Sequence, residues 1–336
     1  MDNKFKNIIL YTILTLITAS LGVTALISNI YKGSTLYILF SSLVFIICLI
    51  TILDIGNIKI KELINSSFIR LFSIIYLILS LIYTISILGI LVNNLFYVIT
   101  PITIILSVIV ILIVILSCNK RTININLFFI LGTICAIILV IFMFLFPKSN
   151  LKLEFNDIEP SNIYLYSYSI LVIDLIFYKF YIKSNYSKNH SKVLIISSII
   201  AIILLSFYTY LDLTITKIDY SNTPFKNILK YQLVLPNINI YVDALYLIIV
   251  FITFIFKLLI FGDNLRVFFL CKKSVKNYFI LYFVIFIISN TLVNQAKNET
   301  TYLYILLSIL TCFSLILLIL IGGYKIAQRI YKYTKK

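Results

Sequence analysis

Asp174 is the residue of this sequence whose surroundings point most clearly to chemistry. It is the only acidic residue deep inside an apolar stretch, residues 162–182, which otherwise has the length and composition of a membrane-spanning helix. At about 1.5 Å per residue it lies roughly 18 Å along that helix, near the centre of a hydrocarbon layer about 30 Å thick. Carboxyl groups at that depth are costly. They usually face a bundle interior or a water-filled path, where they bind a ligand or carry protons.

The charge state of Asp174 separates two possible roles. No cation shares its helix face at mid-depth, because Lys179 lies five residues on and nearer the helix end, so we expect the carboxyl to be neutral at rest. In the structural role, a neutral carboxyl holds its helix against a neighbour by hydrogen bonds. In the ligand or proton role, the carboxyl becomes charged when a cationic group arrives.

Other polar residues at similar depth complete the candidate site. Residues 8–30 contain hydroxyl-bearing and small residues around Ser20, and residues 240–261 contain Thr253. Close helix packing accounts equally well for the small residues, and a bond to its own preceding turn accounts for the hydroxyl of Thr253. The candidate ligand-binding residues are Thr18, Ser20, Gly22, Tyr166, Ser169, Asp174 and Thr253.

The composition shows which elements carry these residues. Of the 336 residues, 62% are hydrophobic and 12% are charged, whereas a soluble domain has about a quarter charged residues. The sequence therefore predicts an all-α integral membrane protein that forms a single domain, residues 1–336. Ten apolar stretches are long enough to span a bilayer: residues 8–30, 35–54, 69–91, 95–117, 125–147, 162–182, 193–213, 240–261, 277–294 and 302–322.

Lysine and arginine set the expected orientation. With the N-terminus inside, 21 of the 28 Lys and Arg residues fall in cytoplasmic segments, as the positive-inside rule requires. Both termini are therefore expected in the cytoplasm. Lys257, near the end of its span, is expected to extend its long stem to the cytoplasmic surface. The net charge of +16 is dispersed over short segments, so we expect no nucleic-acid partner.

The sequence offers little for metal, cofactor or covalent chemistry. Its five cysteines have no paired spacing, and its single histidine, His190, lies in a basic loop. It contains no glycine-rich phosphate loop, no zinc-binding histidine motif and no nucleophile elbow. We therefore expect no catalytic residues, no metal, no cofactor and no enzyme activity.

Ten spans divide into two halves of five, which is typical of transporters built from two inverted five-helix repeats. In such proteins the binding site lies at the midplane, at discontinuous helices in matching positions of the two halves. Here the first helices of the halves are residues 8–30 and 162–182, and both carry polar residues at mid-depth. We expect the two clusters to lie within about two helix diameters, roughly 20 Å, of each other.

Several short motifs occur in the order found in a known family. They are Gly22 in the first span, Lys59-Ile60-Lys61-Glu62-Leu63 before the third, Ile99-Thr100-Pro101 at the start of the fourth, Phe146-Pro147 through Asp157-Ile158-Glu159-Pro160 before the sixth, Asp174 within it, and Val242-Asp243-Ala244-Leu245 at the start of the eighth. In these motifs the chain resembles the B subunit of spore germinant receptors, the endospore germination permease family of the amino acid–polyamine–organocation transporter superfamily. The family's glycine before its helix-6 carboxylate and its proline after it are missing here, which argues against an unwound helix at Asp174.

The resemblance implies a multi-pass protein in the inner membrane of a spore. It implies two partners, a receptor A subunit and a lipoprotein C subunit, and a small germinant such as an amino acid, sugar or nucleoside. Germinant binding at the first and sixth helices would bias a two-state bundle, and the partner subunits would pass that bias on.

Two other functional classes stay open. An amino acid secondary transporter of the same fold would use the same site, and uptake without partner subunits would distinguish it. A membrane polysaccharide polymerase or glycosyltransferase needs charged clusters in a large outer loop, whereas the predicted outer loops hold seven cations and no histidine.

Overall fold

The computed structural model describes residues 35–96, 163–182, 192–201, 255–272, 274–295 and 299–334, with isolated residues 8, 9, 11, 12, 108, 112, 115, 134, 141 and 203. Within these residues the regular structure is helical and no strand occurs. The labelled helices are α3 (Thr35–Leu53), η3 (Ile55–Asn57), α4 (Ile60–Asn65), α5 (Ser67–Phe96), η4 (Ile163–Tyr166), α8 (Ser169–Ile182), α12 (Val275–Gln295) and α13 (Glu299–Thr334). Residues 192–201 and 255–268 are also helical.

Three of the helices are long and apolar enough to cross a membrane. They are Ser67–Ile87 in α5, Val275–Val293 in α12 and Thr301–Tyr331 in α13. Each coincides with a predicted span, so the expectation of a helical membrane protein is confirmed. The number of ten spans and the inverted repeat stay predictions, because large parts of five spans lie outside the described residues: 8–30, 95–117, 125–147, 193–213 and 240–261.

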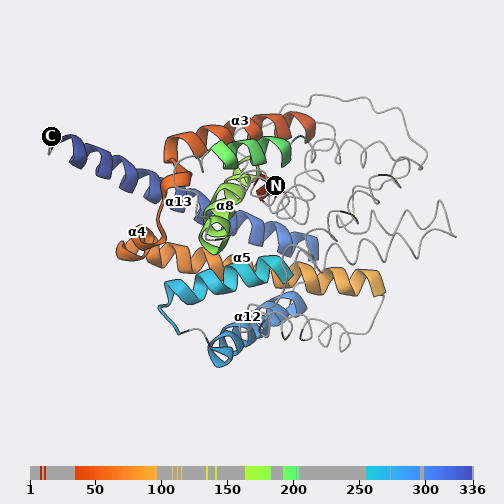
Figure 1. The fold of residues 1–336 in the computed structure, drawn as a ribbon. Helices are drawn as coiled ribbons and strands as arrows, with labels where there is room; N and C mark the ends of the chain where they lie inside the picture. The colour runs from red at the N-terminus through yellow and green to blue at the C-terminus, as the bar shows by residue number, and fades with distance from the viewer. Residues whose placement is uncertain are drawn as a thin grey trace, which may run out of the picture.

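Helices α5 and α13 pack against each other in the described bundle (Figure 1). Helix α13 packs against α5, α8 and α3, and α5 also packs against α12. Between α5 and α13, the rings of Phe72 and Phe313 lie 6.0 Å apart, and the hydroxyls of Ser86 and Tyr302 lie 3.1 Å apart. In a membrane, close packing and such interhelical hydrogen bonds hold helices together, because lipid is as apolar as the side chains.

Two helices run further than the sequence predicted. The expected span 302–322 lies within α13, which continues to Thr334, and the helix 255–268 extends past the end of the expected span 240–261. Hydropathy falls where the membrane ends, but Ala, Gln, Arg and Lys remain good helix formers in water. Gly322 lies inside α13 rather than at its end. A Cβ there would come 3.1 Å from Leu53 Cδ2, so this glycine lets α3 approach closely.

The predicted helix 162–182 is interrupted. A short 3₁₀ segment, η4, is followed by a turn at Ser167 and Tyr168, and α8 begins only at Ser169. The first bonds after the turn span three residues, from the Ile170 and Leu171 amides to the Ser167 and Tyr168 carbonyls at 3.0 and 3.1 Å. Serine favours such turns because its hydroxyl competes for backbone groups. The predicted span is therefore interrupted before Ser169, although it contains no glycine or proline, whereas α8 is continuous at Asp174.

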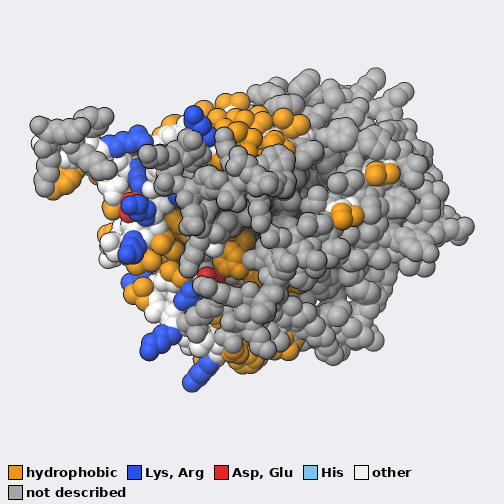
Figure 2. Space-filling view, viewed as in Figure 1, with side chains coloured by type: hydrophobic (Ala, Val, Ile, Leu, Met, Phe, Trp, Pro, Cys, Tyr) orange, Lys and Arg blue, Asp and Glu red, His pale blue; other side chains and the backbone are white. Residues whose placement is uncertain are grey.

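The basic side chains of the described residues gather at one end of the molecule (Figure 2). Contacts join the helix ends there. Lys325 of α13 lies 2.7 Å from Glu62 of α4, and Arg70 of α5 donates to the Phe268 carbonyl at 2.9 Å. All of these residues lie in or next to segments that the cation distribution assigns to the cytoplasm. The described structure thus places these predicted cytoplasmic segments together.

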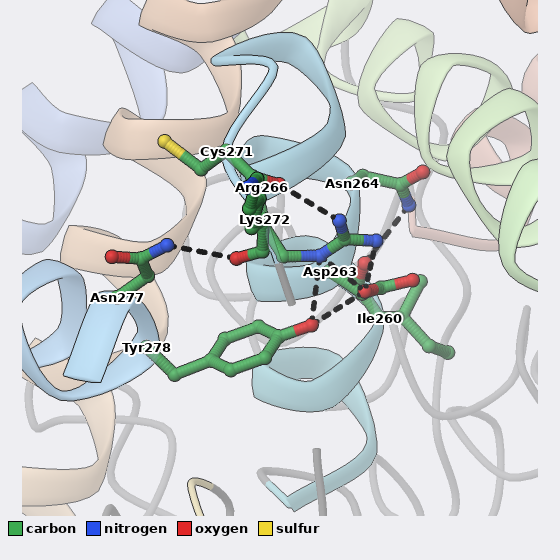
Figure 3. A network of polar contacts seen from close by, with 8 residues as sticks. All are labelled: Ile260, Asp263, Asn264, Arg266, Cys271, Lys272, Asn277 and Tyr278. Atoms are coloured by element: carbon green, nitrogen blue, oxygen red, sulfur yellow. Dashed lines mark hydrogen bonds and ion pairs between the residues drawn. The ribbon is translucent and has the colours of Figure 1, made fainter. Parts of the chain in front are cut away.

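A network of polar contacts lies where the helix 255–268 ends and α12 begins (Figure 3). Arg266 lies 2.9 Å from Asp263, donates to the Tyr278 hydroxyl at 2.9 Å and donates to the Cys271 carbonyl at 3.0 Å. The helix 255–268 ends in a Schellman motif, with bonds from the Cys271 amide to the Arg266 carbonyl and from the Leu270 amide to the Val267 carbonyl, both 3.1 Å. These contacts are the ones expected where a helix ends. The polar groups of the network bond to one another, so it needs no functional explanation.

Leu270→Gly is expected to stabilise the protein by about 0.5–1 kcal/mol. Leu270 has φ 58°, a conformation that costs a residue with a side chain about 1–2 kcal/mol and costs glycine nothing. Glycine also loses more conformational entropy on folding, which reduces the gain in stability by about 0.5–1 kcal/mol. Little burial is lost because Leu270 is 64% exposed. Thermal unfolding in detergent measures the change. Phe269→Gly, at a neighbouring position without the positive φ, should destabilise; a gain there as well would contradict the conformational explanation.

Candidate functional site

Asp174 is fully buried in α8 and is held by a tyrosine from another helix. The hydroxyl of Tyr76, in α5, donates to Asp174 Oδ1 at 2.7 Å, and it also lies 3.3 Å from the Ile170 carbonyl. Both side chains are 0% exposed. A hydrogen bond to a carboxylate in such a place is strong, because little solvent competes for the donor or the acceptor.

A buried lysine is the second partner of Asp174, and this one is charged. Lys257 Nζ lies 3.7 Å from Asp174 Oδ2, and Lys257 is 8% exposed. The expectation that Lys257 reaches the cytoplasmic surface was therefore wrong. The helix of Asp174 offers no cation at this depth, as the sequence indicates, but the helix 255–268 supplies one. At 3.7 Å the pair is an ion pair without a direct hydrogen bond.

Aromatic rings surround this pair. Lys257 Nζ lies 5.3 Å from the ring centre of Phe261 and 6.0 Å from that of Tyr83, within the range of cation–π attraction. Phe177 stacks on Tyr76 at 5.9 Å between ring centres and meets Phe261 edge-on at 6.2 Å. The pair thus lies in surroundings of low polarity, where charges interact strongly and unpaired charges are costly.

Helix α5 contributes a line of buried hydroxyls. Ser73, Tyr76, Ser80 and Tyr83 recur every three or four residues and so lie on one helix face, over about 15 Å. The hydroxyls of Ser73, Ser80 and Tyr83, and Asp174 Oδ2, are buried and have no hydrogen-bond partner among the residues that the structure describes. Most buried polar atoms in proteins are bonded, so such a group of polar atoms on the helix face that contacts Asp174 needs an explanation. We define the charged cluster as Asp174, Lys257, Tyr76, Ser80 and Tyr83.

The other predicted site residues are placed as follows. Ser169 is buried but its hydroxyl bonds to that of Ser314 in α13. Ser169 and Asp174 are five residues apart, so they lie on different faces of α8. Tyr166, in η4, is 40% exposed. Four predicted residues lie outside the described residues: Thr18, Ser20, Gly22 and Thr253.

The beginning of the first predicted span has a described neighbour. The hydroxyl of Ser197 lies 3.2 Å from the Ile8 carbonyl, and that of Thr12 lies 3.5 Å from the Ser197 carbonyl. These contacts join residues 8–12 to the helix 192–201. The convergence of the first and sixth helices at mid-depth stays a prediction.

Sequence reasoning missed Lys257 and the hydroxyl line on α5. The repeat of polar residues in span 69–91 was a usable signal for the second, because it marks one face of a helix. The position of Lys257 near the end of a predicted span concealed its role. Its helix continues to Phe268, past the predicted end of the span at residue 261, so Lys257 lies further from the helix C-terminus than the sequence predicts.

Fold and site together define a class: a helical membrane protein with a buried acid–base pair between three helix segments. In comparisons of the whole chain, no family model and no curated protein matches the sequence.

Proposed function

We propose that this protein binds a small polar molecule at the charged cluster and changes conformation when it does so. As the particular function, we propose the membrane-embedded sensing subunit of a spore germination receptor. The single observation that carries small-molecule binding is the buried Asp174–Lys257 pair, 3.7 Å apart, in which Asp174 Oδ2 has no hydrogen-bond partner among the described residues. The receptor assignment is supported by the family resemblance of the short motifs.

The pair favours a functional role because of its energetics. Removing two charges from water costs several kcal/mol per ion, and a pair at 3.7 Å without a direct hydrogen bond regains only part of that. Two apolar side chains would hold the helices at least as well. Ionisable residues inside a membrane bundle are therefore functional candidates by default.

The geometry also supplies a mechanism. The pair and its tyrosines join α5, α8 and the helix 255–268, which are distant in sequence. A ligand group that bonds to Asp174 Oδ2, or that takes the place of Lys257 beside it, would change the contacts of Asp174 that join these three helix segments. Ligand binding thereby favours one arrangement of the helices over another, and partner A and C subunits of a receptor would respond to that arrangement.

Spore germination tests this proposal. Spores that lack other germinant receptors would carry this chain with its A-like and C-like partners, and ion release would be measured against amino acids, sugars and nucleosides. Asp174→Asn keeps the shape and the acceptor for Tyr76 but cannot ionise. We expect the germinant concentration needed for half-maximal response to rise at least tenfold. Asp263→Asn makes the same chemical change in a partly exposed surface pair and should respond normally. An unchanged response in Asp174→Asn would refute the role of this charge.

A secondary transporter for amino acids is the second candidate, and the contacts at the cytoplasmic end favour it specifically. Lys179 donates to the Ile55 and Ile58 carbonyls at 3.1 and 2.8 Å, and Lys325 pairs with Glu62. These contacts hold helix ends together as a closed gate would in alternating access. Uptake of labelled amino acids into vesicles that contain this chain alone would favour a transporter over a sensor.

A further inference from the structure

Asn264 makes a polar contact between the helix 255–268 and α8, separate from the charged pair. Its side-chain amide donates to the Phe177 carbonyl of α8 at 2.9 Å and to the Ile260 carbonyl of its own helix at 2.9 Å (Figure 3 shows the second bond). Asn264 is buried. An amide nitrogen carries two N–H groups, so both of its donors are used, one between the helices and one within its own helix.

Asn264 lies on the same side of its helix as the lysine of the pair. It follows Lys257 by seven residues, which is two helical turns, so the two side chains project from one face of the helix 255–268. On α8, Phe177 follows Asp174 by three residues, which is also a same-face spacing. The two helices therefore meet along one line of contact, with the ion pair at one level and the amide bond at another.

The amide bond is the more exacting of the contacts along this line. The pair is 3.7 Å apart without a direct hydrogen bond. The ring of Phe177 meets the rings of Phe261 and Phe268 edge-on, at 6.2 and 5.9 Å between ring centres. Apolar attraction has no direction, so ring contacts alone permit some rotation or sliding of one helix on the other. A buried amide permits little, because displacement leaves its donor unpaired.

Other described contacts hold the helix 255–268 against different neighbours. The Tyr282 hydroxyl of α12 donates to the Leu258 carbonyl, and Arg70 of α5 donates to the Phe268 carbonyl at 2.9 Å. These bonds fix the helix to α12 and α5. They do not set its position relative to α8, which carries the carboxylate of the pair.

We propose that Asn264 is a positioning residue that places Lys257 beside Asp174. Its bond to the Phe177 carbonyl sets the rotation and depth of the helix 255–268 against α8. A single buried asparagine has this use in coiled coils, where it specifies the register of the helices at a cost in stability. The inference goes beyond the proposed function, because it concerns how the pair is assembled and not what binds to it.

Amine labelling without any ligand tests the placement of Lys257. Asn264→Thr nearly keeps the side-chain volume, and its one O–H is used by the Ile260 carbonyl four residues back, so the bond to α8 is lost. The full chain in mild detergent is treated with a membrane-permeant succinimidyl ester, and mass spectrometry gives the labelling rate of Lys257 relative to the exposed Lys272. We expect this ratio to rise at least tenfold in Asn264→Thr, because the amine leaves its buried place beside the carboxylate.

Tyr282→Phe is the matched control. It also removes one hydrogen bond to this helix, at the Leu258 carbonyl next to Lys257, but it leaves the contact with α8 intact. Its labelling ratio should change less than twofold. An unchanged ratio in Asn264→Thr would overturn the proposal. An equal rise in both variants would overturn it as well, because general loosening of the helix would then explain the labelling.

Unfolding temperatures give a second measurement with a smaller substitution. Lys257→Met is made in the wild-type chain and in Asn264→Ser, which also loses the bond to α8. The drop in unfolding temperature caused by Lys257→Met should be at most half as large in the Asn264→Ser chain, since the pair is already weakened there. Equal drops in the two chains would mean that Asn264 and the pair contribute independently, which contradicts a positioning role.

Discussion

Lys257→Met is expected to destabilise the protein by about 3 kcal/mol, because it leaves the buried Asp174 carboxylate without its counter-charge. Removing one partner of a buried pair typically costs about 3–5 kcal/mol. We place this pair at the lower end of that range, since the atoms are 3.7 Å apart and Tyr76 continues to donate to Asp174. Unfolding by heat or denaturant in a fixed mild detergent measures the loss.

A double variant separates the charge effect from lost packing. Asp174→Asn combined with Lys257→Met removes both charges at nearly constant volume, and it should recover most of the lost stability. The recovered protein should still fail in ligand response if the charges serve binding. A Lys257→Met protein as stable as wild type would show that the pair does not contribute in the folded bundle.

Gly262→Ala is the second change with a large expected effect, a loss of about 2–4 kcal/mol. A Cβ at Gly262 would lie 2.5 Å from Tyr282 Cζ and closer still to the Tyr282 hydroxyl, and Tyr282 is fully buried. That hydroxyl donates to the Leu258 carbonyl. Overpacking costs about 1–3 kcal/mol and a displaced buried hydroxyl about 1 kcal/mol more.

Gly323→Ala is the matched control for this steric argument. Its Cβ would meet nothing within 4 Å, so the change should be neutral or slightly stabilising through higher helix propensity. Gly262→Ala with Tyr282→Phe should recover part of the loss, because the closest atom is removed while Cζ remains near. If Gly262→Ala and Gly323→Ala unfold at the same temperature, then the close approach of Tyr282 is not the reason for a glycine at position 262.

Asp174 illustrates how far sequence reasoning reaches in this protein. A single carboxyl in an apolar stretch is visible without a structure, because the cost of placing it in a membrane depends on its immediate surroundings. Its partners were not visible. Tyr76 is 98 residues away in sequence. Nothing in the sequence around a tyrosine in an apolar helix indicates which residue its hydroxyl contacts. Lys257 was assigned to the surface because a lysine near a span end usually reaches water.

The break before α8 shows a second limit. Predicted helix breaks depend on glycine and proline, and neither occurs from Ser161 to Ile182. Here serines and tyrosines precede α8, and these residues occur in helices and in turns. Neighbouring packing decides between the two forms, and in this chain α13 packs against both η4 and α8.

The sequence by itself determined that this is a helical membrane protein, that three of its helices lie where hydropathy places them, and that Asp174 is its most unusual residue. Hydropathy is a sum over about 20 neighbouring residues, so a local sequence contains it completely. Only the tertiary structure decided that Lys257 and Tyr76 meet Asp174 and that Ser169 turns to α13 instead. Those contacts depend on the rotation and depth of each helix against its neighbours, which are set by packing between segments far apart in the chain.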